Sequence, residues 1–175
     1  AMTDYLVSLL RKTPKEVIDE VIYLTQGKLR PDYEGVELGL AEKLTLRAIA
    51  QAMGISVKEA EEELRKSGDI GLAAERLMSK RKPVSILEFF GGGEVKTEPL
   101  TVSRVYNTLM RIAKATGEGS QEAKISLLVS LLKSAKPSEA KYILRTITGK
   151  LRLGIADMTI LDALAIAFTG SKAAR

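Results

Sequence analysis

The sequence predicts an all-α protein, a compact multi-helix domain with two pseudo-symmetric helical halves. Apolar residues recur at helical spacing through most of the 175 residues, and no segment alternates convincingly with the period of two that is typical of strands. Capping residues and glycines also mark where most of these helices begin and end. We expect one domain in total, with a first helical half at residues 1–79, a connecting loop at 80–99 and a second half at 100–175.

In the first half, the first helix is expected to begin at Thr13 and to end at Gly27. Thr13-Pro14-Lys15-Glu16 has the pattern of a capping box with proline at the first helical position, and apolar residues follow at helical spacing. Glycine or serine signals bound the other helices of this half, which are expected at residues 40–53, 57–67 and 72–78.

The connecting loop is predicted from its composition, because the helical periodicity fails there and Gly91-Gly92-Gly93 interrupts it. Helical spacing then resumes at Val102. We expect Gly117 to end one helix of the second half and Ser120 to cap the next. The helices of this half are expected at residues 102–113, 121–132, 137–148 and 160–168.

Composition excludes several classes of protein. The chain has no cysteine and no histidine, which excludes disulfide scaffolds, thiol nucleophiles, the commonest zinc sites and Ser-His-Asp catalysis. Aromatic residues make up only 5%, without tryptophan, so a single-strand binder that stacks bases on aromatic side chains is disfavoured. Neither a membrane-spanning run nor a signal peptide is evident, and we expect a cytoplasmic protein without a membrane partner. The net charge of +5 is compatible with a protein that binds the backbone of duplex nucleic acid.

An internal repeat relates the two halves. Three blocks of the first half recur in the same order in the second, namely residues 14–16, 27–30 and 38–41 at residues 137–139, 149–152 and 153–156. Only the first copy contains the insertion at residues 31–37. The repeat predicts two similar helix-turn-helix units in one core, related by a pseudo-two-fold axis.

The junction after each repeated helix has two interpretations. In the first, Gly27 and Gly149 are left-handed C-caps, and the basic residues beside them interact with the carbonyl end of the preceding helix. In the second, the glycine further along leads into a following helix, whose free amides accept a phosphate. A duplicated anion site suits a ligand with approximate symmetry of its own, such as a double helix. The candidate DNA-binding residues of the junctions are Lys28, Arg30, Gly39, Lys150, Arg152 and Gly154.

A third candidate for phosphate binding is the loop at residues 117–124. It is not a nucleotide-binding P-loop, because the Gly-Lys-Ser/Thr ending is missing and no strand precedes it. An ordinary connection between helices is the alternative. Six basic residues and one acidic residue between Lys133 and Arg152 further predict a basic face on the second half, whereas the acidic run at 59–63 is typical of a solvated face. The candidate residues of the loop are Gly117, Gly119, Ser120 and Lys124.

Several motifs carry a resemblance to a known family, namely Leu100–Tyr106, Gly117–Gln121, Gly149–Arg152, Gly154 and Asp162–Phe168 in the second half, and Gly27–Arg30, Glu42-Lys43 and Gly68–Gly71 in the first. Together they resemble the N-terminal DNA-binding domain of archaeal and eukaryotic-type ATP-dependent DNA ligases. The resemblance implies an all-helical domain that grips nicked duplex DNA across the minor groove, through phosphates and without sequence specificity. It also implies a nucleoid-associated monomer that serves DNA replication, repair and recombination.

The same resemblance limits what this chain is expected to do alone. A ligase also needs an adenylation domain with a Lys-x-Asp-Gly nucleophile motif, and the sequence contains no such tetrad. We therefore expect no catalytic residue, no metal site and no cofactor in this chain, while ATP and Mg²⁺ are expected for the full-length ligase. Compared with the family, the chain is expected to begin after the first helix and to stop before the last ones.

A second partner is suggested by the connecting loop. Some archaeal ligases carry a short motif near this point that binds the sliding clamp, and Ile86, Phe89 and Phe90 have its aliphatic-to-aromatic spacing, although Pro83 stands where glutamine is expected. The alternative is that both phenylalanines pack the loop against the core. Two other functions are left open. A helical protein-interaction module predicts an exposed apolar groove and little salt dependence, and a free-standing enzyme would need a nucleophile and base that the sequence does not offer.

Overall fold

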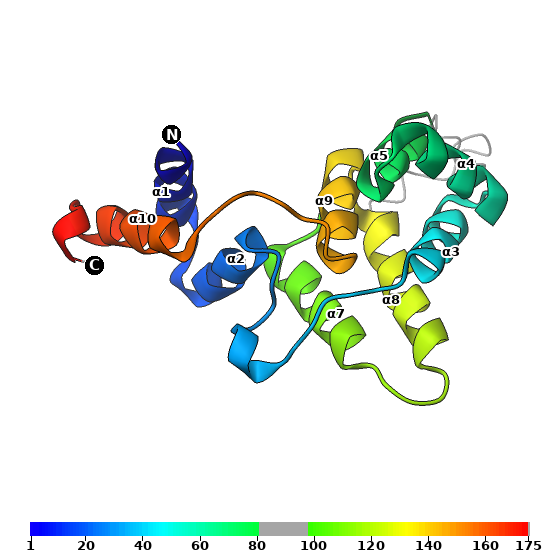
Figure 1. Cartoon of the computed structure of the whole chain (residues 1–175), viewed down its shortest axis with the longest axis horizontal. Coiled ribbons are helices and arrows are strands. Elements are labelled where there is room, and N and C mark those ends of the chain that lie inside the picture. Colours follow the sequence, from blue (N-terminus) through cyan, green and yellow to red (C-terminus); the bar gives the residue numbers. More distant parts are fainter. Residues whose placement is uncertain (81–97, 175) are drawn as a thin grey trace.

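The computed structural model describes residues 1–80 and 98–174, and within these ranges the chain forms helices and connections without any strand (Figure 1). The all-α fold class is therefore confirmed. The α-helices are α1 (Met2–Lys12), α2 (Ile18–Thr25), α3 (Glu42–Met53), α4 (Val57–Ser67), α5 (Ile70–Lys80), α7 (Val102–Lys114), α8 (Ser120–Ser134), α9 (Pro137–Ile147) and α10 (Asp157–Thr169). The short 3-10 helices are η1 (Lys15–Val17), η2 (Asp32–Glu34) and η3 (Lys172–Ala174).

Several helix ends follow the predicted local signals. The hydroxyl of Ser56 accepts a hydrogen bond from the amide of Glu59 at 3.1 Å and so caps α4, which ends at a left-handed Gly68. Helix α5 is longer than predicted, because the carboxylate of Asp69 accepts from the amide of Leu72 at 2.7 Å and begins the helix earlier. Helix α10 also begins earlier, at Asp157.

The capping box predicted at Thr13 is wrong. Helix α1, which the sequence analysis did not predict, occupies the preceding residues, and the Thr13 hydroxyl donates to the carbonyl of Leu9 at 2.7 Å. Thr13 therefore lies against the end of one helix instead of opening the next. Pro14 is followed by the short η1, and α2 begins only at Ile18.

The predicted N-cap of α8 at Ser120 is wrong. Gly119 takes that position with φ of +75°, and Ser120 is the first helical residue. The amide of Ser120 donates to the carbonyl of Gly117 at 3.2 Å, so two left-handed glycines turn the chain into α8 without a side-chain cap.

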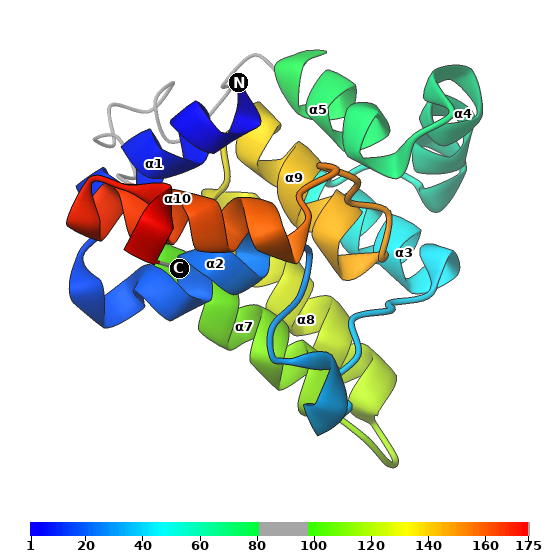
Figure 2. The ribbon, with the colours of Figure 1, turned by 60° about the vertical axis from the view of Figure 1, so that its left-hand side comes forward.

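The helices of the two halves pack against one another in a shared core. Helix α3 lies against α8 and α5 lies against α9, while α1 pairs with α10 in a smaller apolar cluster. Figure 2 shows α1 and α10 side by side, and Figure 1 places this pair at the opposite end of the molecule from α4 and α5. Among the largest side chains that are fully buried in the main core are Ile49, Leu109, Leu128 and Leu144.

Helices α5 and α9 pack closely against each other at Gly71. A Cβ atom added to Gly71 would lie only 2.6 Å from the carbonyl oxygen of Lys141. Ion pairs flank this point, with Lys141 on Glu75 at 2.9 Å and Arg145 on Asp69 at 3.1 Å. Two of the six basic residues counted for the predicted basic face are thus used inside the fold.

Candidate nucleic-acid interface

The two repeated junctions adopt the same backbone motif. Gly27 and Gly149 are left-handed, with φ of +71° and +69°, as expected for C-caps. In each junction the amide after the glycine donates to the carbonyl five residues back, at 2.9 Å in the first and 2.8 Å in the second. The glycine amide itself donates to the carbonyl three residues back in both. This double hydrogen bond is the Schellman motif, and it directs each chain away from its helix in the same way.

The two junctions also contact one another. The amide of Leu40 donates to the carbonyl of Ile147 at 2.9 Å, and a Cβ on Gly149 would lie 3.6 Å from the carbonyl of Leu38. In return, a Cβ on Gly27 would contact the side chain of Leu151 at 3.5 Å. Residues 26–42 and 147–157 therefore form one continuous surface, called the junction surface below.

The helices that follow the junctions begin in the same manner. Ala41 and Ala156, which correspond in the repeat, are the N-caps of α3 and α10, and neither provides a side-chain cap. The glycines before them, Gly39 and Gly154, are exposed, and nothing lies within 4 Å of a Cβ built on either. First-turn amides on an open backbone can receive an anion. However, each helix also begins with a carboxylate, which opposes an approaching phosphate electrostatically.

These first-turn carboxylates are engaged across the two junctions. Glu42 of α3 contacts Lys150 at 3.2 Å, and Asp157 of α10 accepts a hydrogen bond from the side chain of Gln26 at 2.7 Å. Each carboxylate thus meets a polar group from the other copy of the repeat. The pairs tie the beginning of one copy's helix to the end of the other copy's helix.

The predicted cations of the junction surface differ in how they are paired. Lys28 contacts Asp32 at 2.9 Å, and Arg30 contacts both oxygens of Glu34 at 2.7 and 3.1 Å. The pKa of Arg30 is raised, first by the hydrogen bond to Glu34 and then by its charge. Arg152, in contrast, is exposed and has no ion pair with any residue in 1–80 or 98–174.

A buried phenol fixes the first junction to the core. The hydroxyl of Tyr106 on α7 donates to the carbonyl of Leu29, and both residues are buried. Burial raises the pKa of Tyr106 above its ordinary value of 10.0, although the neighbouring Arg30 lowers it. Leu29 lies between Lys28 and Arg30, so this hydrogen bond positions both cations.

Changing Tyr106 to Phe is expected to lower the free energy of unfolding by about 1 to 3 kcal/mol, because the buried Leu29 carbonyl loses its donor. The raised pKa adds a pH dependence. Wild-type stability from this phenol is present below the unfolded pKa and is lost as the pH rises through the folded one, because the unfolded state releases the proton first. Urea unfolding at neutral and alkaline pH measures both effects. Tyr33→Phe, at an exposed position, is the control, and an unchanged midpoint for Tyr106→Phe would contradict the prediction.

The loop at residues 117–124 lies at a separate corner of the molecule, where α7 connects to α8 (Figures 1 and 2). Gly117 and Gly119 are exposed and left-handed, and Lys124 is half-buried without an ion pair in the described part of the chain. The neighbouring Glu122 contacts Arg47 of α3 at 2.7 Å. Helix α3 therefore links this loop to the junction surface, although the loop is not part of that surface.

Sequence reasoning missed two basic residues beside this loop. Arg111 and Lys114 lie in the last turn of α7, are exposed and line a hollow of about 630 Å³ between α7 and α8. Neither forms an ion pair within the residues that the structure describes. Their spacing of three residues at a helix end is visible in the sequence, so charge on that helix was a signal that could have found them.

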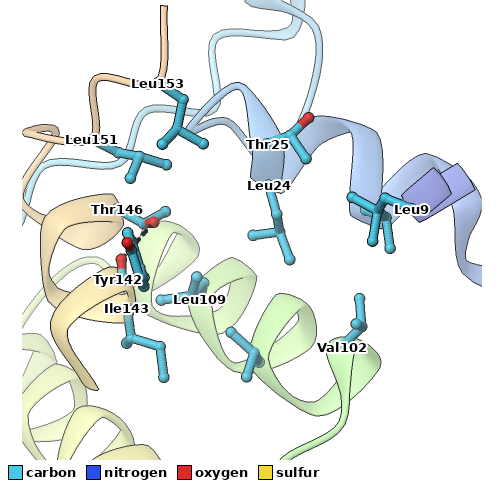
Figure 3. Close-up of a pocket in the computed structure, with 12 residues that line it drawn as sticks. Leu9, Leu24, Thr25, Val102, Leu109, Tyr142, Ile143, Thr146, Leu151 and Leu153 are labelled. Atoms are coloured by element: carbon cyan, nitrogen blue, oxygen red, sulfur yellow. Dashed lines mark hydrogen bonds between the residues drawn. The ribbon is translucent and has the colours of Figure 1, made fainter. Parts of the chain in front are cut away.

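An apolar groove of about 310 Å³ lies between α1, α2, α7 and α9 (Figure 3). Leu24 of α2 and Leu109 of α7 line it from opposite sides, with Leu151 and Leu153 of the second junction above them. The lining includes four exposed apolar side chains, Leu9 at 41%, Val102 at 39%, Tyr142 at 48% and Leu153 at 40% exposed. An exposed apolar groove is the feature expected of a protein-interaction module.

Three other expectations concern features outside the two phosphate candidates. The clamp-binding candidates Ile86, Phe89 and Phe90 lie outside the described residues. Throughout 1–80 and 98–174, the helices are too short or too polar to cross a lipid bilayer. The same residues contain no group of three or more carboxylates arranged to hold a metal ion.

Comparison with known proteins gives the chain a family. Residues 1–165 match the family model described as DNA ligase N terminus. The chain is 65% identical over 175 residues to DNA ligase 2 of Thermofilum pendens, covering 100% of this chain and 29% of that protein. It is 56% identical over 171 residues to the DNA ligase of Caldivirga maquilingensis, covering 95% and 28%, and 51% identical over 171 residues to that of Nitrosopumilus maritimus, covering 98% and 28%. The chain thus spans less than a third of these archaeal relatives, and it belongs to the family of DNA ligase N-terminal domains.

Proposed function

We propose that this chain is the non-catalytic DNA-binding module of an ATP-dependent DNA ligase and that it holds nicked duplex DNA through phosphate and minor-groove contacts. The observation that carries the proposal is the junction surface. Two copies of a glycine-and-cation motif meet there through the Leu40–Ile147 hydrogen bond, although they lie more than a hundred residues apart in sequence. Each segment also leads into a helix whose first-turn amides have no side-chain cap, and two such segments side by side match the two strands of a duplex.

The chemistry of this surface favours contacts to the DNA backbone over base reading. It offers lysine, arginine and free helix amides, and these bind phosphate but carry no sequence information. Arg152 and the open backbone at Gly154 lie two residues apart in the second junction, and residues 149–156 contain no carboxylate. The proposed binding is accordingly structure-selective, and unrelated duplexes should bind alike.

Nick sealing is assigned to parts of the ligase other than this chain. The chain lacks the Lys-x-Asp-Gly tetrad that carries the adenylate in ligases, and its relatives are more than three times longer. The proposal therefore places ATP and Mg²⁺ in the full-length enzyme. We also propose that the protein is a cytoplasmic, nucleoid-associated monomer and that it binds the sliding clamp through Ile86, Phe89 and Phe90.

Binding of the chain to a labelled nicked duplex, measured by fluorescence anisotropy at about 50 and about 200 mM salt, tests the proposal. Each phosphate that a lysine or arginine neutralises should add about 0.9 to the slope of log affinity against log salt. We expect a slope of at least about 2, with equal affinities for duplexes of unrelated sequence. Affinity that does not change with salt would contradict the proposal.

A protein-interaction module is the second candidate function, and the apolar groove favours it. The groove has four exposed apolar side chains on its lining and lies beside the second junction. Contacts there would depend on buried apolar area, so their strength would change little with salt. The salt titration of the preceding test therefore separates the two candidates.

A further inference from the structure

We propose that the insertion at residues 31–37, called the acidic insertion below, neutralises the cations of the first junction and so leaves the phosphate contacts to the second. This inference rests on the proposed DNA-binding function and adds which of the junction cations contact the phosphates. It predicts that Lys28 and Arg30 contribute to DNA affinity only after their carboxylate partners are removed.

The acidic insertion places its carboxylates directly on the two cations. Asp32 and Glu34 each lie four residues after the cation that they contact, Lys28 at 2.9 Å and Arg30 at 2.7 and 3.1 Å. The contact of Arg30 is a parallel pair of hydrogen bonds, which is the strongest arrangement of these two groups. Both cations are therefore already paired in the free protein.

The backbone of the insertion holds these carboxylates in position. Pro31 precedes the 3-10 turn η2. The amide of Glu34 donates to the carbonyl of Pro31 at 3.0 Å, and the amide of Gly35 donates to the carbonyl of Asp32 at 3.2 Å. Gly35 is left-handed, with φ of +65°, and closes the turn. An ordered turn lowers the entropy cost of keeping each ion pair formed.

The second copy of the repeat provides the comparison. Residues 149–156 contain the two matching cations and no carboxylate, whereas residues 27–37 contain two cations and three carboxylates. Within the described residues, the one ion-pair partner of Lys150 is Glu42, which lies far from it in sequence and contacts it at 3.2 Å. Arg152 forms no ion pair within these residues. The same motif is thus electropositive in one copy and self-neutralised in the other, and the insertion accounts for the difference.

The consequence for DNA binding follows from counterion release. A cation that is paired with a protein carboxylate carries few counterions and displaces few from DNA, so it adds little to the salt dependence. Changing Asp32 to Asn and Glu34 to Gln should free both cations and steepen the slope of log affinity against log salt by about 1.8. Lowering the salt from about 200 to about 50 mM should then increase affinity by an extra factor of about 12.

A double-mutant cycle on the chain, with nicked duplex as the probe, tests the inference. The four proteins are wild type, D32N/E34Q, K28A/R30A and the quadruple variant, with circular dichroism to confirm that each is folded. We expect K28A/R30A to leave the wild-type slope unchanged and to remove the whole gain of D32N/E34Q. The matched control is E59Q/E61Q, which removes two exposed carboxylates of α4 that form no ion pair in the described part of the chain.

Three results of the DNA titration would overturn the inference. A slope reduced by about 1.8 in K28A/R30A alone would mean that both cations already contact phosphate. An unchanged slope in D32N/E34Q, or an equal gain in E59Q/E61Q, would remove any special role of the insertion. If the wild type binds no duplex, the proposed function fails, and elution from heparin still decides the inference. D32N/E34Q eluting at higher salt than E59Q/E61Q supports it, and equal elution overturns it.

Discussion

Replacing Lys150 and Arg152 together by alanine is expected to reduce the slope of log affinity against log salt for nicked duplex by about 1.8. Arg152 forms no ion pair within residues 1–80 and 98–174, so its loss alone should account for about half of this change. Lys150 should account for the other half. The contact of Lys150 with Glu42 is longer than that of Lys28 with Asp32, at 3.2 against 2.9 Å, and no local turn such as η2 holds it. Glu42 also keeps its favourable interaction with the N-terminal end of α3 when Lys150 moves to a phosphate.

The matched control is the pair Arg65→Ala and Lys66→Ala, which removes two cations from the last turn of α4. It should leave the slope unchanged, and fluorescence anisotropy over a salt series measures both variants. The C-capping interpretation of the junction makes the opposite prediction for Lys150 and Arg152. It requires a loss of stability of about 0.3 to 1 kcal/mol per charge with unaltered DNA affinity, and that result would move the proposed footprint to residues 117–124.

Local signals in the sequence predicted most of the helices. Ser56 and Gly68 bound α4 because a serine side chain and a left-handed glycine act within three or four residues of themselves. Gly27 and Gly149 end their helices for the same reason, as the left-handed residues that follow the C-caps Gln26 and Thr148. Thr13 and Ser120 are exceptions. The Thr13 hydroxyl donates to the carbonyl of Leu9 at the end of α1 instead of capping the next helix, and Gly119 takes the N-cap position of α8 in place of Ser120. A threonine between two helices can accept a hydrogen bond at the start of the second or donate one at the end of the first, and the sequence pattern does not distinguish the two.

The pairing of the candidate site could not be predicted from the sequence to the same extent. Lys150 meets Glu42 and Arg47 meets Glu122 across 108 and 75 residues, distances that no local pattern relates. The contact of Lys28 with Asp32 was different, because an i,i+4 spacing is visible in the chain. It becomes predictable only once η2 is known to bend the insertion back onto the cation. The sequence repeat identified the candidate cations, whereas the fold determines which of them form ion pairs with carboxylates.

A large change in stability is expected from Gly71→Ala, which should lower the free energy of unfolding by about 1 to 3 kcal/mol. In an open helix the same change would stabilise by about 0.5 to 1 kcal/mol, because glycine pays more backbone entropy than alanine. Here the added Cβ would lie 2.6 Å from the backbone oxygen of Lys141, and a backbone atom cannot turn aside as a flexible side chain can. Helices α5 and α9 must separate, and the overpacking cost exceeds the entropy gain.

The separation should also loosen the ion pairs that flank the contact, Glu75 with Lys141 and Asp69 with Arg145. Urea unfolding gives the change as a shift of midpoint at constant slope, which identifies a change in stability alone. Gly39→Ala is the matched control, because Gly39 is not left-handed and a Cβ there meets nothing within 4 Å, so its effect should stay within about 0.5 kcal/mol. A Gly71→Ala protein as stable as wild type would mean that α5 and α9 can move apart at no cost. In that case the glycine would not be required for their close packing.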